Sequence, residues 1–177
     1  MFFIEDNNFL NLEQKEFIEK NVLSSFFPFY FQKNSTSYDK NSSLSHIIKV
    51  APEIRKEGEV FNSSFGNIFE DMLKTFCKKN NIEFKESLRI AVNFTYNNGA
   101  DFCPTHLDHE FPHKQLLIYL NDPLDKKTKT VILDDDEKTI LKEVYPEKYK
   151  GVCFENKPHY HYYPKIGERI VVVYTFI

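Results

Sequence analysis

Apolar residues recur at every second position over much of the chain after residue 84, which is the periodicity of β-strands with one buried face. The first alternating segment runs from Leu88 to Tyr96. Turn sequences rich in Asn, Asp, Gly and Pro separate the further candidate strands, which are 115–120, 128–133, 139–144, 151–155, 159–163 and 168–176. So many short strands in succession predict two packed β-sheets, as in a jelly roll.

The first 83 residues favour helices instead. Asn11 and Gln14 have the spacing of a capping box, and they predict a helix that runs to about Leu23. A second helix is expected after a cap at Ser63 or Ser64, with apolar residues at helical spacing, and it ends in lysines and asparagines at 78–81.

Between these two helices the sequence changes character. Residues 26–32 are rich in aromatic side chains and strand-like, but Pro28 would restrict them to a sheet edge or a bulge. Residues 33–48 are rich in Ser, Asn, Thr and Asp, and we interpret them as a long polar loop. We therefore predict one domain, 1–177, of the α+β but mainly β class. Helical and sheet support over 1–83 would carry a jelly-roll core over 84–177, with the N-terminal helices packed on the major sheet.

Charge and composition exclude several classes of protein. The formal net charge is −3, from 23 basic and 26 acidic residues, and the absence of a basic run argues against nucleic-acid binding. No apolar run approaches the roughly 18–20 residues of a membrane span, and acidic residues follow Met1-Phe2-Phe3-Ile4 too soon for a signal peptide. The three cysteines show no close pairing. We expect a cytoplasmic protein, of a bacterial cell or of a virus in its host cytoplasm, because the residue usage is that of an AT-rich genome.

Five of the six histidines lie between positions 106 and 161, and one of them begins the motif His106-Leu107-Asp108. In an extended segment, residues i and i+2 point the same way, so His106 and Asp108 can converge on one metal ion. Two histidines and one carboxylate are the set that binds Fe(II) on one face and leaves the other open. The third ligand must come from another strand. His159 and His161 share one face of the segment 159–163, and Pro158 stiffens the backbone before His159.

Several motifs together resemble the Fe(II)- and 2-oxoglutarate-dependent dioxygenases, and most closely their prolyl-4-hydroxylase-like branch. These motifs are His106-x-Asp108, Leu117-Ile118-Tyr119-Leu120-Asn121, Phe154 before His159, and Gly167-Glu168-Arg169-Ile170-Val171-Val172-Val173. The resemblance covers 84–177 and implies a double-stranded β-helix. It implies that His106, Asp108 and His159 bind iron, with His161 as the alternative third ligand. It also implies that Arg169 holds the distal carboxylate of 2-oxoglutarate; its spacing of ten residues from His159 favours that histidine.

The resemblance extends to the cosubstrate pocket and to the reaction. Tyr119, Tyr96 and Thr130 match residues that line the 2-oxoglutarate site of related hydroxylases. The implied enzyme uses O₂ to couple decarboxylation of 2-oxoglutarate, to succinate and CO₂, with hydroxylation of a C–H bond. Ascorbate is a candidate reductant. Asp108 in the ligand set favours hydroxylation over halogenation, in which a halide takes the carboxylate position.

The substrate is expected to be a small molecule or a peptide, such as a prolyl residue or another amino acid. Residues 33–62 and 97–105 are the expected source of substrate contacts, because such contacts sit on variable loops. Two alternatives remain open. One is a non-catalytic jelly-roll module that binds a metal or a small acid. The other is a nucleic-acid demethylase on the same fold, which the acidic net charge disfavours.

Overall fold

The computed structural model describes residues 2–34, 41–56, 58 and 61–177. Its helices are α1 (Leu12–Phe17), the π-helix η1 (Ile18–Val22) and α2 (Gly66–Lys79). Its strands are β1 (Phe3–Asp6), β2 (Tyr30–Gln32), β3 (Ser43–Lys49), β4 (Ser87–Tyr96), β5 (Lys114–Tyr119), β6 (Thr130–Leu133), β7 (Ile140–Val144), β8 (Gly151–Glu155), β9 (His159–His161) and β10 (Glu168–Phe176).

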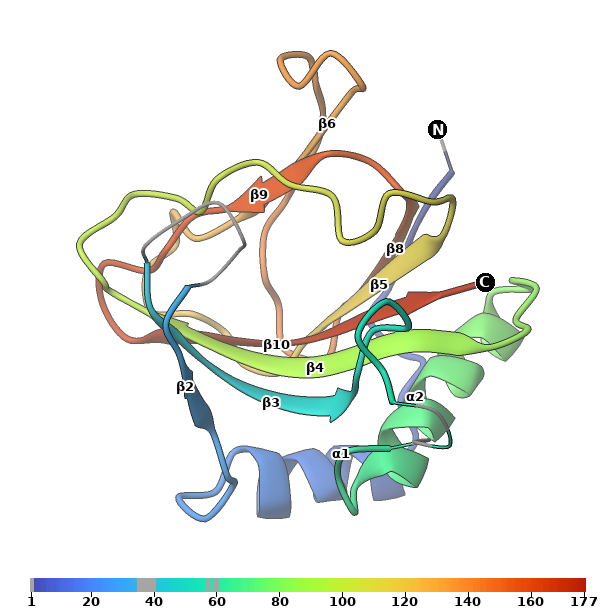
Figure 1. Ribbon diagram of the computed structural model, residues 1–177. Helices are drawn as coiled ribbons and strands as arrows, with labels where there is room; N and C mark the ends of the chain where they lie inside the picture. The colour runs from blue at the N-terminus through green and yellow to red at the C-terminus, as the bar shows by residue number, and fades with distance from the viewer. Residues whose placement is uncertain (1, 35–40, 57, 59–60) are drawn as a thin grey trace.

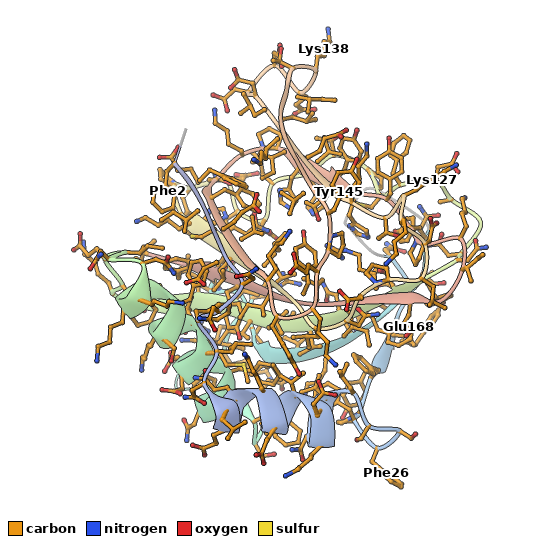
Figure 2. The ribbon with its side chains drawn as sticks, turned by 180° about the vertical axis from the view of Figure 1, so that it is seen from behind. Phe2, Phe26, Lys127, Lys138, Tyr145 and Glu168 are labelled. Carbon is orange, nitrogen blue, oxygen red and sulfur yellow. The ribbon has the colours of Figure 1, made fainter. Side chains whose placement is uncertain are left out.

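The strands form two antiparallel sheets of unequal size. The major sheet has the order β1-β8-β5-β10-β4-β3-β2, and the minor sheet has the order β7-β6-β9. Figure 1 shows the helices against one face of the major sheet and the minor sheet over the other face. In the reverse view of Figure 2, Lys138 marks the tip of the β6–β7 hairpin, which projects from the minor sheet, and Phe26 marks the loop that follows η1. This arrangement confirms the predicted jelly roll with N-terminal helices packed on the major sheet.

The register of β10 defines the two faces of the major sheet. Arg169, Val171, Val173 and Thr175 lie directly opposite Thr95, Asn93, Ala91 and Arg89 of β4. Residues opposite one another in an antiparallel ladder project to the same side, so this set faces the minor sheet. The intervening residues, such as Ile170, Val172 and Tyr174, face the helices and join the larger apolar core.

The helical layer begins with the predicted capping box. The Asn11 side chain accepts from the Gln14 backbone N–H at 2.9 Å, and the Gln14 side chain accepts from the Asn11 N–H at 3.1 Å. Gln14 is fully buried, and its amide also donates to Asp71 and Thr75 of α2. The box therefore fixes the start of α1 and also ties α1 to α2.

The predicted cap of the second helix was wrong. The residue before α2 is Phe65, and no side chain caps the helix; the Ser63 hydroxyl accepts only from the Phe65 backbone N–H, at 3.3 Å. The helix starts instead where the chain packs tightly, because a Cβ on Gly66 would lie 2.1 Å from the Phe61 ring. Close packing rather than a polar cap sets this end of α2.

The loop predicted over 33–48 was also wrong where it overlaps β3; its residues 35–40 lie outside the described part. Ser45 of β3 lies opposite Asn93, so serines that suggested a loop instead extend the polar face of the sheet. On the other side of β3, Ile48 is completely buried in the main core. With β1 and β2, the first 83 residues thus supply three strands of the major sheet as well as the helices.

Among the described residues, no helix combines the length and the apolar character that crossing a membrane requires.

Candidate functional site

A cavity of about 240 Å³ lies on the polar face of the major sheet, between β4, β5 and β10 on one side and β6 and β9 on the other. The segment 106–108 also lines it. Its charged lining residues are Arg89, Asp108 and Arg169. Residues far apart in the sequence therefore share one polar chamber.

His106 and His159 lie side by side in this cavity. Each backbone N–H donates to the carbonyl of the other residue at 3.1 Å, and the ring centroids are 4.5 Å apart. The Nδ1 atom of His106 is 2.9 Å from the Pro104 carbonyl, and that of His159 is 3.0 Å from the Lys157 carbonyl. A carbonyl only accepts, so each Nδ1 carries the proton and each Nε2 keeps a lone pair. Both rings are thus held in the tautomer that ligates a metal through Nε2.

Burial keeps His159 in its neutral form. The ring is 6% exposed, and desolvation, assisted by neighbouring His106, lowers its pKa to about 4. The Phe154 ring packs against it edge-on, with the centroids 5.6 Å apart. His159 therefore remains uncharged at neutral pH, which is the form that ligates a metal through Nε2.

Asp108 completes this group and remains ionised. Burial raises the pKa of its carboxyl, but the positive charge of Arg89 and the nearby imidazoles outweigh that effect, and the pKa lies below its ordinary value. Arg89 Nη1 lies 3.4 Å from Oδ1, while the Gln115 amide donates to Oδ2. The Asp108 Oδ2 and His159 Nε2 atoms are 3.8 Å apart.

Two imidazole nitrogens and a carboxylate are donors that suit a first-row divalent metal. Neighbouring ligands on one face of an octahedral ion, each bound at roughly 2.1 Å, lie about 3.0 Å apart, so Asp108 Oδ2 and His159 Nε2, which are 3.8 Å apart, would have to move closer to share an ion. Among the described residues, however, no three His, Cys, Asp or Glu side chains already enclose a metal position. The Gln115 amide nitrogen contacts both Asp108 Oδ2 and, at 3.3 Å, His159 Nε2. Metal binding would therefore require the Gln115 side chain to turn away from them.

His161 lies further along β9, near the arginine end of the cavity. It is opposite Thr130 in the β6–β9 ladder, and its Nδ1 atom is 3.1 Å from Cys103 Sγ. Burial, followed by the charge of Arg169, lowers its pKa well below the ordinary value, and its buried Nε2 has no hydrogen-bond partner. His159 thus contacts Asp108, while His161 lies beside Arg169.

Arg169, Tyr119 and Thr130 meet at this second end. Arg169 Nη2 donates to Thr130 Oγ1 at 3.1 Å, and the Tyr119 and Thr130 hydroxyls are 2.8 Å apart. The guanidinium carbon lies 5.3 Å from the centre of the Tyr119 ring. Arg169 is only 3% exposed, its Nε has no hydrogen-bond partner, and none of the ion pairs among the described residues includes it. A buried guanidinium without an anion is costly, so this end is suited to a carboxylate ligand.

The backbone around Arg169 is held from both sides. Thr95 Oγ1 donates to the Arg169 carbonyl at 3.1 Å. The Asn121 side chain donates to the Glu168 carbonyl at 3.0 Å and accepts from the Ile170 N–H at 2.8 Å. Gly167, immediately before β10, has a φ of 73°, a left-handed conformation that glycine adopts without strain. These contacts fix the direction in which Arg169 enters the cavity.

Tyr96, by contrast, does not line the cavity. It pairs with Glu168 at the end of β4 and shares the face of Phe94, opposite to that of Thr95 and Arg169. Its hydroxyl lies 3.3 Å from the Ser42 hydroxyl. The structure therefore does not bring Tyr96 together with Arg169, and its predicted cosubstrate role stays a prediction.

Two further histidines, His109 and His113, lie near the site, and their hydrogen bonds go to groups other than Asp108. His109 Nδ1 is 2.6 Å from Glu53 Oε1, and its Nε2 is 2.7 Å from Thr175 Oγ1, so it links the loop after Asp108 to β10. His113 Nδ1 lies 2.9 Å from the Phe111 carbonyl. Both nitrogens of His109 are thus already engaged by protein groups.

The sequence reasoning missed three polar residues of the cavity: Arg89, Asn93 and Gln115. The alternation in β4 and β5 contains the necessary signal, since each of these residues lies at an even spacing from an inward neighbour. The alternation alone does not show which of the two faces of the sheet lines the cavity. The register with β10 supplies that information.

Comparisons with known proteins were made by sequence and by structure. No family model matches the chain, and no curated protein matches it by sequence. An oxidoreductase of the 2OG-Fe(II) oxygenase family from Burkholderia pseudomallei matches in structure with a TM-score of 0.73 at 15% identity, over 98% of this chain and 84% of that one. A Trichoplax adhaerens prolyl hydroxylase, in complex with a peptide fragment of hypoxia inducible factor, gives 0.67 at 14%, over 98% and 83%. A Pseudomonas putida prolyl-4-hydroxylase gives 0.61 at 13%, over 98% and 91%.

These structures define the class of fold. The chain has the jelly-roll fold of the 2OG-Fe(II) oxygenases, prolyl hydroxylases among them, over nearly its whole length. The resemblance inferred from the motifs is thereby confirmed at the level of the fold. At identities of 13–15% the likeness carries the fold alone, and the chemistry must be argued from the cavity.

Proposed function

We propose that this protein is an Fe(II)- and 2-oxoglutarate-dependent oxygenase that hydroxylates a C–H bond and releases succinate and CO₂. The observation that carries the proposal is the division of one cavity into two ends. His106, Asp108 and His159 lie at one end, and the buried, unpaired Arg169 lies at the other. Fe(II) needs the first set, and a dicarboxylic keto acid needs both.

At the metal end, Asp108 Oδ2 and the Nε2 atoms of His106 and His159 would hold the ion. The backbone carbonyls of Pro104 and Lys157 keep the two imidazoles in the required tautomer, so neither ring must release a proton from Nε2 first. When bound, Fe(II) with 2-oxoglutarate supplies the O₂ chemistry. Because the protein would supply only three ligands, the remaining coordination positions would be open to the keto acid and O₂.

At the arginine end, Arg169 would bind the distal carboxylate of 2-oxoglutarate. The guanidinium offers a planar fork of N–H donors, and the partnerless Nε is one of them. Thr130 already accepts from Nη2, and Tyr119 can donate its hydroxyl proton to the same carboxylate. Burial raises the pKa of Tyr119, so its hydroxyl keeps that proton at neutral pH. The cavity walls would also exclude water from the reacting groups.

The proposal also covers the class of substrate. The Trichoplax neighbour is a prolyl hydroxylase seen with a peptide fragment, and the remaining cavity of this chain could receive a prolyl residue, another amino acid or a small metabolite. Ascorbate as a reductant and a cytoplasmic location stay predictions of the sequence.

The test measures binding and turnover separately. Calorimetry under anaerobic conditions gives the affinity for Fe(II) and then for 2-oxoglutarate, and succinate formation is followed in air. Asp108→Ala should weaken metal binding by more than about a hundredfold, because even residues behind the ligands contribute roughly tenfold to hundredfold. Arg169→Gln should weaken 2-oxoglutarate binding by about thirtyfold while metal binding persists. Lys129→Gln, on a lysine outside the cavity, is the control and should change neither.

Two outcomes would count against the proposal. If the wild-type protein and both cavity variants bind metal and keto acid equally, the cavity is not the site. If the wild type binds both ligands and forms no succinate with any amino acid or peptide offered, the protein is a binding module that keeps the pocket without the reaction.

A further inference from the structure

The cavity contains a second arginine that the proposed metal and keto-acid sites do not use. Arg89 lies on β4 opposite Thr175, near the end of the β4–β10 ladder remote from Arg169. Its side chain is 24% exposed and lines the cavity. Its one ion pair among the described residues is the contact with Asp108 Oδ1 at 3.4 Å.

The charges of the cavity do not balance. Among the described residues that line the cavity, two guanidinium groups, Arg89 and Arg169, face a single carboxylate, that of Asp108, which leaves one positive charge. A divalent metal ion and a doubly charged 2-oxoglutarate cancel one another, so loading both leaves this excess unchanged. The metal ion and the cosubstrate together therefore do not neutralise this excess.

The excess positive charge of the cavity lies at Arg89. Arg169 would be matched by the keto acid, whereas Asp108 would share its charge with the metal ion and become a weaker partner for Arg89. Asn93 lies on the same face of β4 and lines the cavity too. Its Oδ1 accepts from the Ser45 hydroxyl at 2.9 Å, and its amide nitrogen remains a donor. Arg89 and Asn93 together offer N–H groups suited to an oxyanion.

We infer that Arg89, with Asn93 beside it, binds an oxyanionic group of the substrate, a carboxylate or a phosphate, and so selects negatively charged small molecules. This inference rests on the proposed function, because it assigns Arg169 to the keto acid. Neutral internal residues of a peptide would then be poor substrates, since they would leave the charge of Arg89 unmatched.

The test uses simple anions as probes. Protein labelled with ¹⁵N is loaded with redox-inert Zn(II) and 2-oxoglutarate, and the Nε–H resonance of Arg89 is followed while acetate, inorganic phosphate or neutral acetamide is added. The expected result is a saturable shift in the millimolar range with acetate or phosphate and none with acetamide. The stronger of the two anions identifies the substrate group.

Variants decide whether Arg89 is the cause. Arg89→Gln should weaken binding of the anion by about tenfold, because it removes a charged donor, and leave 2-oxoglutarate affinity unchanged. Arg89→Lys keeps the charge, and its affinity for the anion should lie between those of the wild type and Arg89→Gln. It serves as the test variant if Arg89→Gln does not fold. Lys129→Gln should bind the anion like the wild type.

Three results would overturn the inference. They are no saturable shift with either anion, equal anion affinity in the wild type and Arg89→Gln, or a loss of 2-oxoglutarate affinity in Arg89→Gln. The last would mean that Arg89 serves the keto acid. Failure of the proposed function is distinguishable, because the wild type would then bind neither Zn(II) nor 2-oxoglutarate before any anion is added, and the inference would fall with it.

Discussion

The two faces of the major sheet are built by the same strands but serve opposite purposes. On the helix side, β10 contributes Ile170, Val172 and Tyr174 to one continuous apolar core. On the cavity side, the same strand carries Arg169, whose Nε has no partner. Alternation along one strand thus separates residues that stabilise the fold from residues that are held at a cost in stability.

This difference indicates where function lies. Apolar burial is the dominant favourable contribution to folding, so the helix face needs no ligand to be stable. Buried polar groups without partners are rare in folded proteins and call for an explanation. Among the described residues, five buried side-chain atoms lack a partner, and two of them, Arg169 Nε and His161 Nε2, belong to residues that line the cavity. The cavity face is organised for a ligand.

The largest effect on stability is expected from a substitution on the apolar, helix side of the major sheet. Phe76 of α2 is completely buried, touches the Phe9 ring with centroids 4.9 Å apart, and packs against the strand at Gly151. Phe76→Ala should lower the free energy of unfolding by about 3–5 kcal/mol, measured by urea denaturation. Asn93→Ala on the cavity face is the matched variant and should cost less than about 1 kcal/mol. Equal costs would show that the two faces do not differ in this way.

The sequence predicted the fold well where alternation was regular. All seven strand segments expected after residue 84 are strands, and the capping box at Asn11 is present. It failed at β1, which has four residues, and at β3, which contains two serines and a lysine; both become strands by pairing with β8 and β4. Tertiary pairing of this kind leaves no local signal.

The candidate site was predicted unevenly for a related reason. The spacing of His106 and Asp108 and the alternation at His159 predicted that these residues converge, and all three line one cavity. The family resemblance selected Arg169, Tyr119 and Thr130, which lie together. It also selected Tyr96, which strand parity places on the helix side, and the roles of all these residues stay predictions. Gln115 on β5 and Arg89 on β4 contact Asp108 from the two sides of β10, and only the register reveals them.

The pH dependence of stability offers a smaller test of the cavity face. The pKa of His159 is about 4 in the folded protein against an ordinary value of 6.5, so below pH 6.5 the unfolded chain binds a proton that the folded protein does not. Its contribution to stability is therefore complete above pH 6.5 and is lost as the pH falls towards 4. The loss is up to about 3 kcal/mol in the metal-free protein.

Urea unfolding of the metal-free protein between pH 7.5 and 4 measures this loss. His159→Asn should flatten the curve by that amount, and the other buried histidines together with carboxylates of lowered pKa, such as Asp108 and Glu70, would account for what remains. The slope with pH is the quantity to compare, because the substitution also changes packing at every pH. An unchanged slope would mean that His159 is protonated at an ordinary pKa.

The smallest expected effect concerns the layer that supports the apolar face. Asn11 caps α1 through the Gln14 N–H, and the reciprocal bond from Asn11 to the Gln14 side chain leaves the Gln14 amide aimed at Asp71 and Thr75. Asn11→Ala should lower the free energy of unfolding by about 1 kcal/mol, and Asn11→Ser by less, because serine also caps. Metal and 2-oxoglutarate affinities should stay at wild-type values in both variants, since α1 and the minor sheet lie on opposite sides of the major sheet (Figure 1) and the cavity lies between the two sheets. A change in either affinity would show that the helix layer and the cavity are energetically coupled, and the separation of roles between the two faces would then be incomplete.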